Sequence, residues 1–218
     1  RVCELLGTEA ALFLPTGTMA NQISFRVHCR PGDEIIMERT SHARNFESGG
    51  PAAISGANAE IIEGQAGMFS ANQLEAAIRG GDNHFPRSRV ALVEQTANLA
   101  GGTVWPLDQI EAVSETAHRH GLAVHMDGAR LFNAVVETHT PASEYARHCD
   151  SLWVDFSKGL GAPVGAALAG SRDFIEQAWR FKHQFGGAMR QSGVIAAAAL
   201  HALDNNVERL ADDHANAR

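Results

Sequence analysis

The stretch LWVDFSKGLGAPVGAALAG, residues 152–170, decides the fold class of this chain. It contains two almost continuous apolar runs, Leu152–Phe156 and Gly165–Ala169, which are typical of strands that are buried on both faces of a sheet. The segment SKGLGAPVG, residues 157–165, follows the first run and places three glycines around Lys158. We therefore expect a buried sheet with a lysine in the loop that leaves one of its strands.

Outward from this stretch, short β-rich runs alternate with helical patterns from Asp33 to about Gly170. Such alternation indicates βαβ units, which together build a mainly parallel sheet flanked by helices. Because no repeat or extended linker interrupts the pattern, we predict one α/β domain. The other expected strands are Glu34–Met37, Glu60–Glu63, Val90–Glu94 and Leu122–Met126.

Capping residues mark the ends of the expected helices. Ser70, with Gln73 three residues later, predicts a capping box, and Gly80 and Gly81 supply a stop for that helix. Further helices are expected from about Leu107 to Gly121, after Ser171 as an N-cap, and through the Ala-rich run Ile195–Leu203 toward Leu210.

Composition limits the classes of partner. The 218 residues are 44% hydrophobic and 20% charged, and the net charge of -7 argues against a broad nucleic-acid interface. No apolar run approaches the ~20 residues that cross a bilayer, and no cationic leader opens the chain. Cys3, Cys29 and Cys149 are widely spaced without a CxxC motif, so we expect neither disulfides nor a thiolate zinc site, and a cytoplasmic location. Because Arg1 is the first residue and Val2–Leu6 resembles the middle of a helix, we expect a piece of a longer chain.

Lys158 is a candidate ligand-binding residue because it follows the carboxyl end of a predicted strand. In open α/β sheets ligands bind at this edge, so a lysine there can present its amine to a cofactor. The alternative is an exposed loop lysine beside a turn.

The segment HMDGAR, residues 125–130, ends another predicted strand. Alternate residues of a strand share a face, so His125 and Asp127 are expected to point the same way. Asp127 can bind a protonated ring nitrogen, or it caps a helix that begins near Ala129. Arg130 either clamps a carboxylate or phosphate or pairs with Asp127.

The segment LPTGTMANQ, residues 14–22, is typical of a loop that opens a helix. Free amides at a helix N-terminus and two hydroxyls form an anion pocket at Gly17 and Thr18, with simple threonine capping as the alternative. No GxxxxGK[ST] or GxGxxG spacing occurs, which argues against nucleotide-dependent functions.

His42 follows the strand predicted at Glu34–Met37. Its flat imidazole can stack on an aromatic ring or transfer a proton, or it is a buried structural histidine. His118 and His120 are two residues apart on a predicted helix and point to different sides, so no metal site is expected there. No GxSxG motif supports a hydrolase triad.

Taken together and in this order, these segments resemble the threonine aldolase and β-eliminating lyase family of pyridoxal-phosphate enzymes, which have the aspartate aminotransferase type of fold, fold type I. The resemblance covers nearly all 218 residues and implies a three-layer α/β/α large domain over residues 1–218, without the smaller C-terminal domain of the family. The segments that carry it are Leu14–Gln22, His42 with Phe46–Gly50, Glu94–Leu107, His125–Ala134, Ser157–Gly165 and Gly186–Gly193.

The resemblance implies a role for each candidate residue. Lys158 is expected to bond covalently to the aldehyde of pyridoxal 5'-phosphate, Asp127 to keep the pyridine nitrogen protonated, and His42 to stack on the ring. Gly17 and Thr18 are expected to receive the phosphate.

Two arginines complete the implied site. Arg130 is expected near the phenolic oxygen of the cofactor and the carboxylate of the substrate, and Arg190 is expected to reach the phosphate of a neighbouring subunit. The resemblance therefore implies a homo-oligomer with shared sites, usually a tetramer, and no metal.

The reaction implied is the cleavage of a β-hydroxy-α-amino acid, such as threonine or allo-threonine, to glycine and an aldehyde. Ala97 stands where many members carry a histidine near the substrate hydroxyl, which leaves β-elimination or another carbon-bond lyase reaction as an alternative. His183 stands where lysine is common, and Ala188 interrupts a glycine run, so the phosphate contact from the second subunit is open. A non-catalytic fragment that keeps only the fold is a third interpretation.

Overall fold

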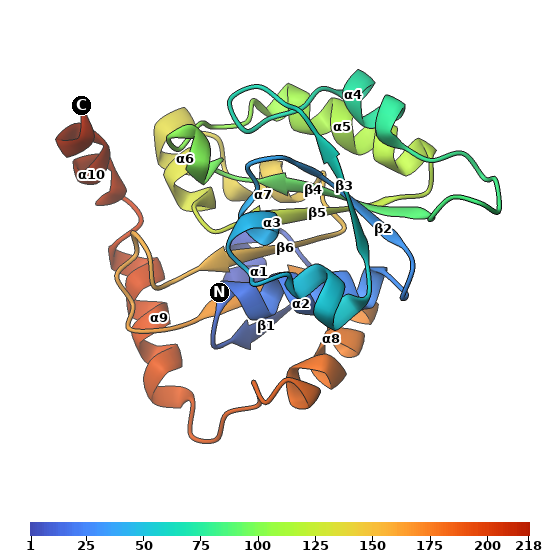
Figure 1. The fold of residues 1–218 in the computed structure, drawn as a ribbon. Helices are drawn as coiled ribbons and strands as arrows, with labels where there is room; N and C mark the ends of the chain where they lie inside the picture. Colours follow the sequence, from blue (N-terminus) through green and yellow to red (C-terminus); the bar gives the residue numbers. More distant parts are fainter.

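A seven-stranded sheet crosses the middle of the computed structural model, which describes all of residues 1–218 (Figure 1). The strand order is β1-β7-β6-β5-β4-β2-β3. Neighbours from β6 to β3 pair in parallel, whereas β7 pairs antiparallel with both β6 and β1. The strands are β1 (Ala10–Leu14), β2 (Glu34–Glu38), β3 (Asn58–Ile62), β4 (Ser88–Glu94), β5 (Ala123–Gly128), β6 (Ser151–Asp155) and β7 (Ala166–Gly170).

Helices cover both faces of the sheet. In Figure 1, α4 and α5 lie on one side of the sheet, and α2 and α8 lie on the other. The helices are α1 (Val2–Leu6), α2 (Gly17–His28), α3 (His42–Asn45), α4 (Ala71–Ala77), α5 (Leu107–Arg119), α6 (Leu131–Thr138), α7 (Ala142–Ala146), α8 (Arg172–Gln184), α9 (Gly193–Asn205) and α10 (Leu210–Ala217), with a π-helical turn at Pro51–Ser55 and a 3-10 turn at Asn98–Ala100.

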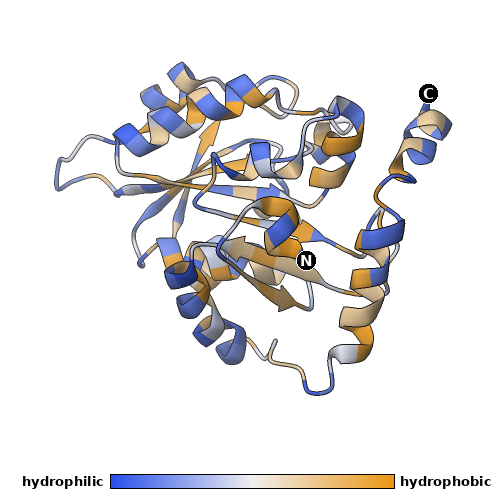
Figure 2. Ribbon diagram, turned by 180° about the vertical axis from the view of Figure 1, so that it is seen from behind, coloured by the Kyte–Doolittle hydropathy of each residue, from blue (hydrophilic) through white to orange (hydrophobic).

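The apolar runs form the sheet because both of their faces are buried. Along β6, Leu152 and Val154 belong to the large core beneath α4 and α5, while Trp153 between them belongs to the core beneath α2 and α8. Successive side chains of a strand point to opposite faces of the sheet. Because helices cover both faces, the side chains on both faces are buried and the strand carries a continuous apolar run instead of alternating between apolar and polar residues. Figure 2 shows the same arrangement, with orange strands in the centre and blue outer faces on the surrounding helices.

Most predicted elements are confirmed with shifts of one or two residues at their ends. The predicted α/β class is confirmed, and Ser70 and Gln73 form the complete capping box of α4. Ser171 accepts a hydrogen bond from the backbone N–H of Phe174 at the start of α8, as an N-cap should.

Four features differ from the sequence prediction. Gly80 and Gly81 do not end α4, because that helix ends at Ala77 with Ile78 as its C-cap. Strand β1 was not expected. The Ala-rich helix does not continue to Leu210, because α9 ends at Asn205 and α10 begins a separate helix after a turn. The helix expected near Ala129 begins at Leu131. No helix in the structure is both long and apolar enough to span a membrane.

Candidate active site

Asp127 lies at the carboxyl end of β5 and is the most deeply buried acid of the candidate site, with 1% of its surface exposed. One carboxylate oxygen accepts a hydrogen bond from Asn21 Nδ2 (2.9 Å), and the other accepts from the backbone N–H of Ala129 (3.1 Å). Burial, followed by the nearby carboxylates of Glu94 and Glu47, raises the pKa of Asp127 to about 7. A cationic group placed against this carboxylate would favour its ionised form and lower its pKa.

Glu47 lies beside Asp127 although the two are far apart in the chain. The Asn21 amide donates to Glu47 Oε1 (2.7 Å) as well as to Asp127, and Gln22 Nε2 donates to Glu47 Oε2 (2.6 Å). One face of α2 thus holds two buried carboxylates together at the edge of the sheet.

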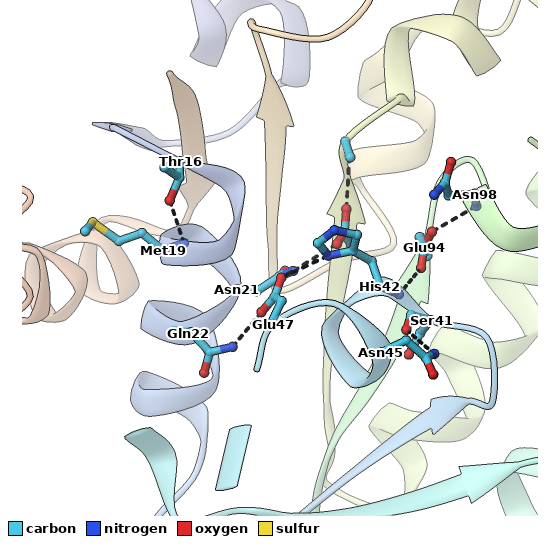
Figure 3. Close-up of polar contacts among 12 residues, drawn as sticks. Thr16, Met19, Asn21, Gln22, Ser41, His42, Asn45, Glu47, Glu94 and Asn98 are labelled. Carbon is cyan, nitrogen blue, oxygen red and sulfur yellow. Dashed lines mark hydrogen bonds and ion pairs between the residues drawn. The ribbon is translucent and has the colours of Figure 1, made fainter. Parts of the chain in front are cut away.

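His42 begins α3, and its ring faces Glu47 (Figure 3). Its Nδ1 lies 3.2 Å from Glu47 Oε1, and its backbone N–H donates to Glu94 Oε2 at the end of β4 (2.6 Å). The hydrogen bond to Glu47, partly offset by burial, raises the pKa of His42 above its usual value. The potential ligand atoms of His42, Glu47 and Asp127 lie within 4.8 Å of one another. Both carboxylates already accept hydrogen bonds from Asn21, so this cluster is a polar network that surrounds one side of the imidazole.

Lys158 reaches the same region from the loop after β6. Its amine lies 3.8 Å from Asp155 Oδ2 and 5.6 Å from the centre of the Trp153 ring. The positive charge of Lys158 opposes, as the smallest influence, the effects that raise the pKa values of His42 and Asp127. With 33% of its side chain exposed, Lys158 is half-buried and not the freely exposed loop lysine of the alternative interpretation.

The loop that carries Lys158 is fixed by the acid at the end of β6. Asp155 Oδ1 accepts hydrogen bonds from the backbone N–H of Ser157 (2.6 Å), the Ser157 hydroxyl (2.7 Å) and the backbone N–H of Lys158 (3.2 Å). This turn holds the backbone of Lys158 directly over the strand end.

The N-terminus of α2 opens at the same edge. Thr16 is the N-cap, and its hydroxyl accepts a hydrogen bond from the backbone N–H of Met19 (3.1 Å). The amides of Gly17 and Thr18 precede the first helical hydrogen bond, which the N–H of Ala20 donates to the Thr16 carbonyl. The threonine-capping alternative is therefore observed at Thr16, and the anion pocket at Gly17 and Thr18 stays a prediction.

Gly17 is required by its contact with the sheet. A Cβ atom at this position would lie 2.1 Å from Cη2 of the Trp153 indole. The first turn of α2 thus lies directly against β6, the strand that leads to Lys158.

The two arginines of the predicted site lie apart from this network. Arg130 donates its backbone N–H to the Gln95 carbonyl (3.1 Å) and lines a pocket of about 340 Å³ with Thr96 and Asn133. It forms no ion pair with Asp127, so the pairing alternative is wrong. Arg190 is exposed between α8 and α9 and contacts none of the other candidate residues through a hydrogen bond.

The segment before Arg190 does lie near the start of α2. A Cβ atom on Gly187 would come within 2.4 Å of Met19 Sδ, in the first turn of that helix. Gly187 therefore packs against the side chain of Met19, beside the first turn of α2.

The sequence prediction assigned no role to Asn21, Glu47 or Asp155. All three lie in or beside segments that the resemblance uses, but their roles depend on contacts between distant parts of the chain. A signal for Asp155 was present in the sequence, since an acid two residues before a serine can cap the turn that follows a strand.

A family model described as β-eliminating lyase matches residues 1–218. The low-specificity L-threonine aldolase of Escherichia coli strain K12 is 43% identical over 215 residues, which cover 98% of this chain and 64% of that protein. The low-specificity L-threonine aldolase 1 of Arabidopsis thaliana is 41% identical over 221 residues, which cover 100% of this chain and 62% of that protein. The chain thus spans less than two thirds of the length of these relatives.

Solved structures show the same fold. A protein of Listeria monocytogenes, described as a candidate L-allo-threonine aldolase, superposes with a TM-score of 0.87 at 26% identity, over 97% of this chain and 57% of that chain. The threonine aldolase of Leishmania major superposes with a TM-score of 0.86 at 23% identity, over 95% of this chain and 62% of that one, which shows the fold alone. By the family match over its whole length, the chain belongs to the β-eliminating lyase family.

Proposed function

We propose that residues 1–218 form the cofactor-binding domain of a pyridoxal-phosphate lyase that cleaves a β-hydroxy-α-amino acid of the threonine type to glycine and an aldehyde. The observation that carries the proposal is the arrangement of three side chains at one edge of the sheet. His42 and Asp127 have polar atoms within 4.8 Å of each other, and Lys158 follows β6, the strand that pairs with β5 beside Asp127. The first turn of α2 lies against the same strand, β6. The relatives named L-threonine aldolase support the substrate class.

The residues at this edge fit the chemistry of the cofactor. Asp127 is a buried carboxylate without a cationic hydrogen-bond partner, which suits a protonated pyridine nitrogen, and the Gly17 and Thr18 amides suit a phosphate. The His42 imidazole offers a flat face, and Lys158 offers the amine that the aldehyde requires. When bound, the cofactor supplies an electron sink for the bond that breaks next to the α-carbon.

Three residues of the chain bind or orient the reacting groups. Asp127 keeps the ring nitrogen cationic, since an adjacent carboxylate favours the charged form. Lys158 presents its amine from a loop that Asp155 fixes. Arg130 is placed to bind a carboxylate with its bidentate guanidinium, because its side chain forms no ion pair within the chain.

Ala97 carries no group that can accept a proton. It is 3% exposed, and a Cβ atom on Gly67 would come within 2.5 Å of Ala97 Cβ. The proton of the substrate hydroxyl must therefore pass to a group other than the side chain at position 97, such as a histidine or a water molecule.

We further propose a homo-oligomer in the cytoplasm, in which Arg190 serves the site of a neighbouring subunit. The exposure of Arg190 and the packing of Gly187 against Met19 of α2 support an interface at this end of the helix.

The test uses the fact that Lys158 and Lys182 are the only lysines of the chain. The chain is incubated with pyridoxal 5'-phosphate, reduced with borohydride, and mapped by mass spectrometry for the cofactor adduct. We expect the adduct on Lys158 in the unchanged chain and in the matched control Lys182→Met, and none in Lys158→Met. An adduct that persists in Lys158→Met, or that never forms, contradicts the proposal.

The reaction itself is tested with L-threonine and L-allo-threonine in parallel. Release of glycine and acetaldehyde supports aldol cleavage, whereas release of ammonia and a keto acid would assign the chain to β-elimination. A chain that binds the cofactor without either reaction would be a binding domain that lacks part of its site.

A further inference from the structure

A line of buried polar side chains runs through the molecule from one end of the sheet to Asp127, and the reaction proposed above uses only its last member. His28 Nε2 lies 2.8 Å from Ser151 Oγ, and Ser151 Oγ lies 2.9 Å from His125 Nδ1. His125 Nε2 lies 3.1 Å from Asn21 Oδ1, and Asn21 Nδ2 lies 2.9 Å from Asp127. His125, Asn21 and Ser151 are completely buried.

The orientation of the Asn21 amide is determined by groups that can act in only one way. Trp153 Nε1–H is a donor, so the atom that it contacts at 2.7 Å must be the Asn21 oxygen. The carboxylates of Glu47 and Asp127 are acceptors when ionised, so the atom between them must be the Asn21 nitrogen. The amide therefore donates one N–H to each carboxylate.

This orientation also determines the tautomer of His125. Because His125 Nε2 faces the Asn21 oxygen, it must carry a proton. Burial lowers the pKa of His125 to about 3, so the ring is neutral and Nδ1 is bare. The Ser151 hydroxyl must then donate to Nδ1, and it accepts in turn from the Nε2–H of His28.

We propose that His125 is a positioning residue whose Nε2–H, maintained by the Ser151 hydroxyl, holds the Asn21 amide in the orientation that donates to both Asp127 and Glu47. This inference rests on the proposed function, in which Asp127 is the partner of the cofactor ring. Two ionised carboxylates that lie this close repel each other, and the Asn21 N–H groups between them offset that repulsion. A reversed amide would point its oxygen at both carboxylates and weaken the ionised form of Asp127.

The competing arrangement is also visible in the structure. His125 Nδ1 lies 3.2 Å from the Ser151 backbone oxygen, which can accept a proton from the other tautomer. In that tautomer His125 Nε2 carries no proton and faces the Asn21 oxygen, so two hydrogen-bond acceptors lie opposite each other. The Asn21 oxygen then keeps only one donor, the Trp153 N–H, to fix its orientation. The Ser151 hydroxyl at 2.9 Å is the group that favours the first arrangement.

The first experiment needs no cofactor. Long-range ¹H–¹⁵N NMR spectra of the full ligand-free chain report which ring nitrogen of His125 is protonated. We expect the Nε2–H tautomer in the unchanged chain and a shift toward the Nδ1–H tautomer in Ser151→Ala. A ring protonated at Nδ1 in the unchanged chain, or an unchanged tautomer in Ser151→Ala, overturns the inference.

The second experiment measures the dissociation constant of pyridoxal 5'-phosphate. His125→Gln keeps a side-chain N–H that can donate to Asn21, whereas His125→Leu removes it. We expect His125→Leu to weaken binding up to about tenfold, the upper end of the usual effect of losing one neutral hydrogen bond, and His125→Gln to restore most of it. Val124→Ala, on the opposite face of β5, matches a loss of core packing without contact to Asn21 and is expected to bind normally.

The two experiments separate this inference from the proposed function. If His125 is protonated at Nε2 but neither the unchanged chain nor any variant binds the cofactor, the proposed function fails and the positioning of Asn21 by His125 stands. If the unchanged chain binds the cofactor and His125→Leu binds equally well, the positioning role fails. Should His125→Leu not fold, Trp153→Phe removes the other donor to the Asn21 oxygen and is expected to weaken binding by a similar factor.

Discussion

The substitution Asp127→Asn is expected to stabilise the ligand-free chain at alkaline pH while abolishing its affinity for the cofactor. In the folded chain, burial raises the pKa of Asp127 from 3.8 to about 7. The folded state therefore binds more protons than the unfolded state between these values, and the ionised carboxylate lowers the free energy of unfolding as the pH rises through this window. Asparagine carries no charge and escapes this cost.

The size of the effect follows from the two pKa values. By linkage, the raised pKa of Asp127 lowers the free energy of unfolding of the unchanged chain by ~1.7 kcal/mol at pH 5 and by ~4 kcal/mol at pH 8. The stability of Asp127→Asn relative to the unchanged chain should therefore rise by ~2.5 kcal/mol from pH 5 to pH 8. An opposing loss does not depend on pH. Asparagine has one oxygen where Asp127 accepts from both Asn21 and Ala129, and a buried donor left without an acceptor costs ~1–3 kcal/mol.

The assay is urea denaturation of both proteins at pH 5 and pH 8. His28 and His125 contribute equally to both proteins and cancel in the difference, because Asp127 does not influence their pKa values. His42 does not cancel, because the charge of Asp127 helps to raise its pKa, so its titration is followed by NMR in both proteins. The exposed variant Glu111→Gln gives the baseline for removing a surface carboxylate. A stability difference that stays constant within ~0.5 kcal/mol, or that reverses its direction with pH, would refute the assignment of Asp127 as a buried, charge-destabilised acid. Saturating cofactor should raise the melting temperature of the unchanged chain and not that of the variant.

Three further outcomes are expected. Gly17→Ala should lower the free energy of unfolding by ~1–3 kcal/mol in urea denaturation, because its Cβ would lie 2.1 Å from the Trp153 indole. The control Gly193→Ala, with no atom within 4 Å of the new Cβ, should change stability little. Equal effects of the two substitutions would contradict the close contact. Ser70→Ala should cost ~1 kcal/mol through loss of the α4 capping box, and a change below the error of the measurement would show that the cap is dispensable. Burial lowers the pKa of His28 to about 4, so the chain should lose stability as the pH falls from 6.5 toward 4, and acid titration of His28→Gln, followed by circular dichroism, should show a shallower loss.

The elements that the sequence predicted well are those that depend on local chemistry. Ser70 and Gln73 form a capping box from residues three positions apart, and β6 is recognisable because both of its faces are apolar. Strand β1 could not be predicted in the same way. Its five residues acquire a strand conformation by pairing with β7, more than 150 residues later in the chain.

The break between α9 and α10 has a similar reason. Residues 206–209 contain no glycine or proline, so helix propensity alone predicts continuation. Tertiary contacts decide otherwise, since Asn206 donates its side-chain amide to the Leu160 carbonyl (2.7 Å) and α10 turns to pack against α6.

Within the candidate site, the residues at strand ends were predictable and the residues between them were not. Lys158 and Asp127 follow apolar strands, which is a local signal that places them at the ligand-binding edge. Asn21 lies on a helix among other polar and apolar residues, and only the packing of α2 against the sheet brings its amide between Glu47 and Asp127.

The position of β1 at the sheet edge bears on how the protein is made. During synthesis β1 leaves the ribosome before the other strands of the sheet, but its sole partner in the sheet, β7, follows more than 150 residues later. The helix α2 follows β1 directly, so its first-turn amides cannot settle against Trp153 until β6 has also been translated. The proposed phosphate-binding site at Gly17 and Thr18 should therefore form only after β6 and β7 have been translated, and a chain arrested before residue 150 should not bind pyridoxal 5'-phosphate.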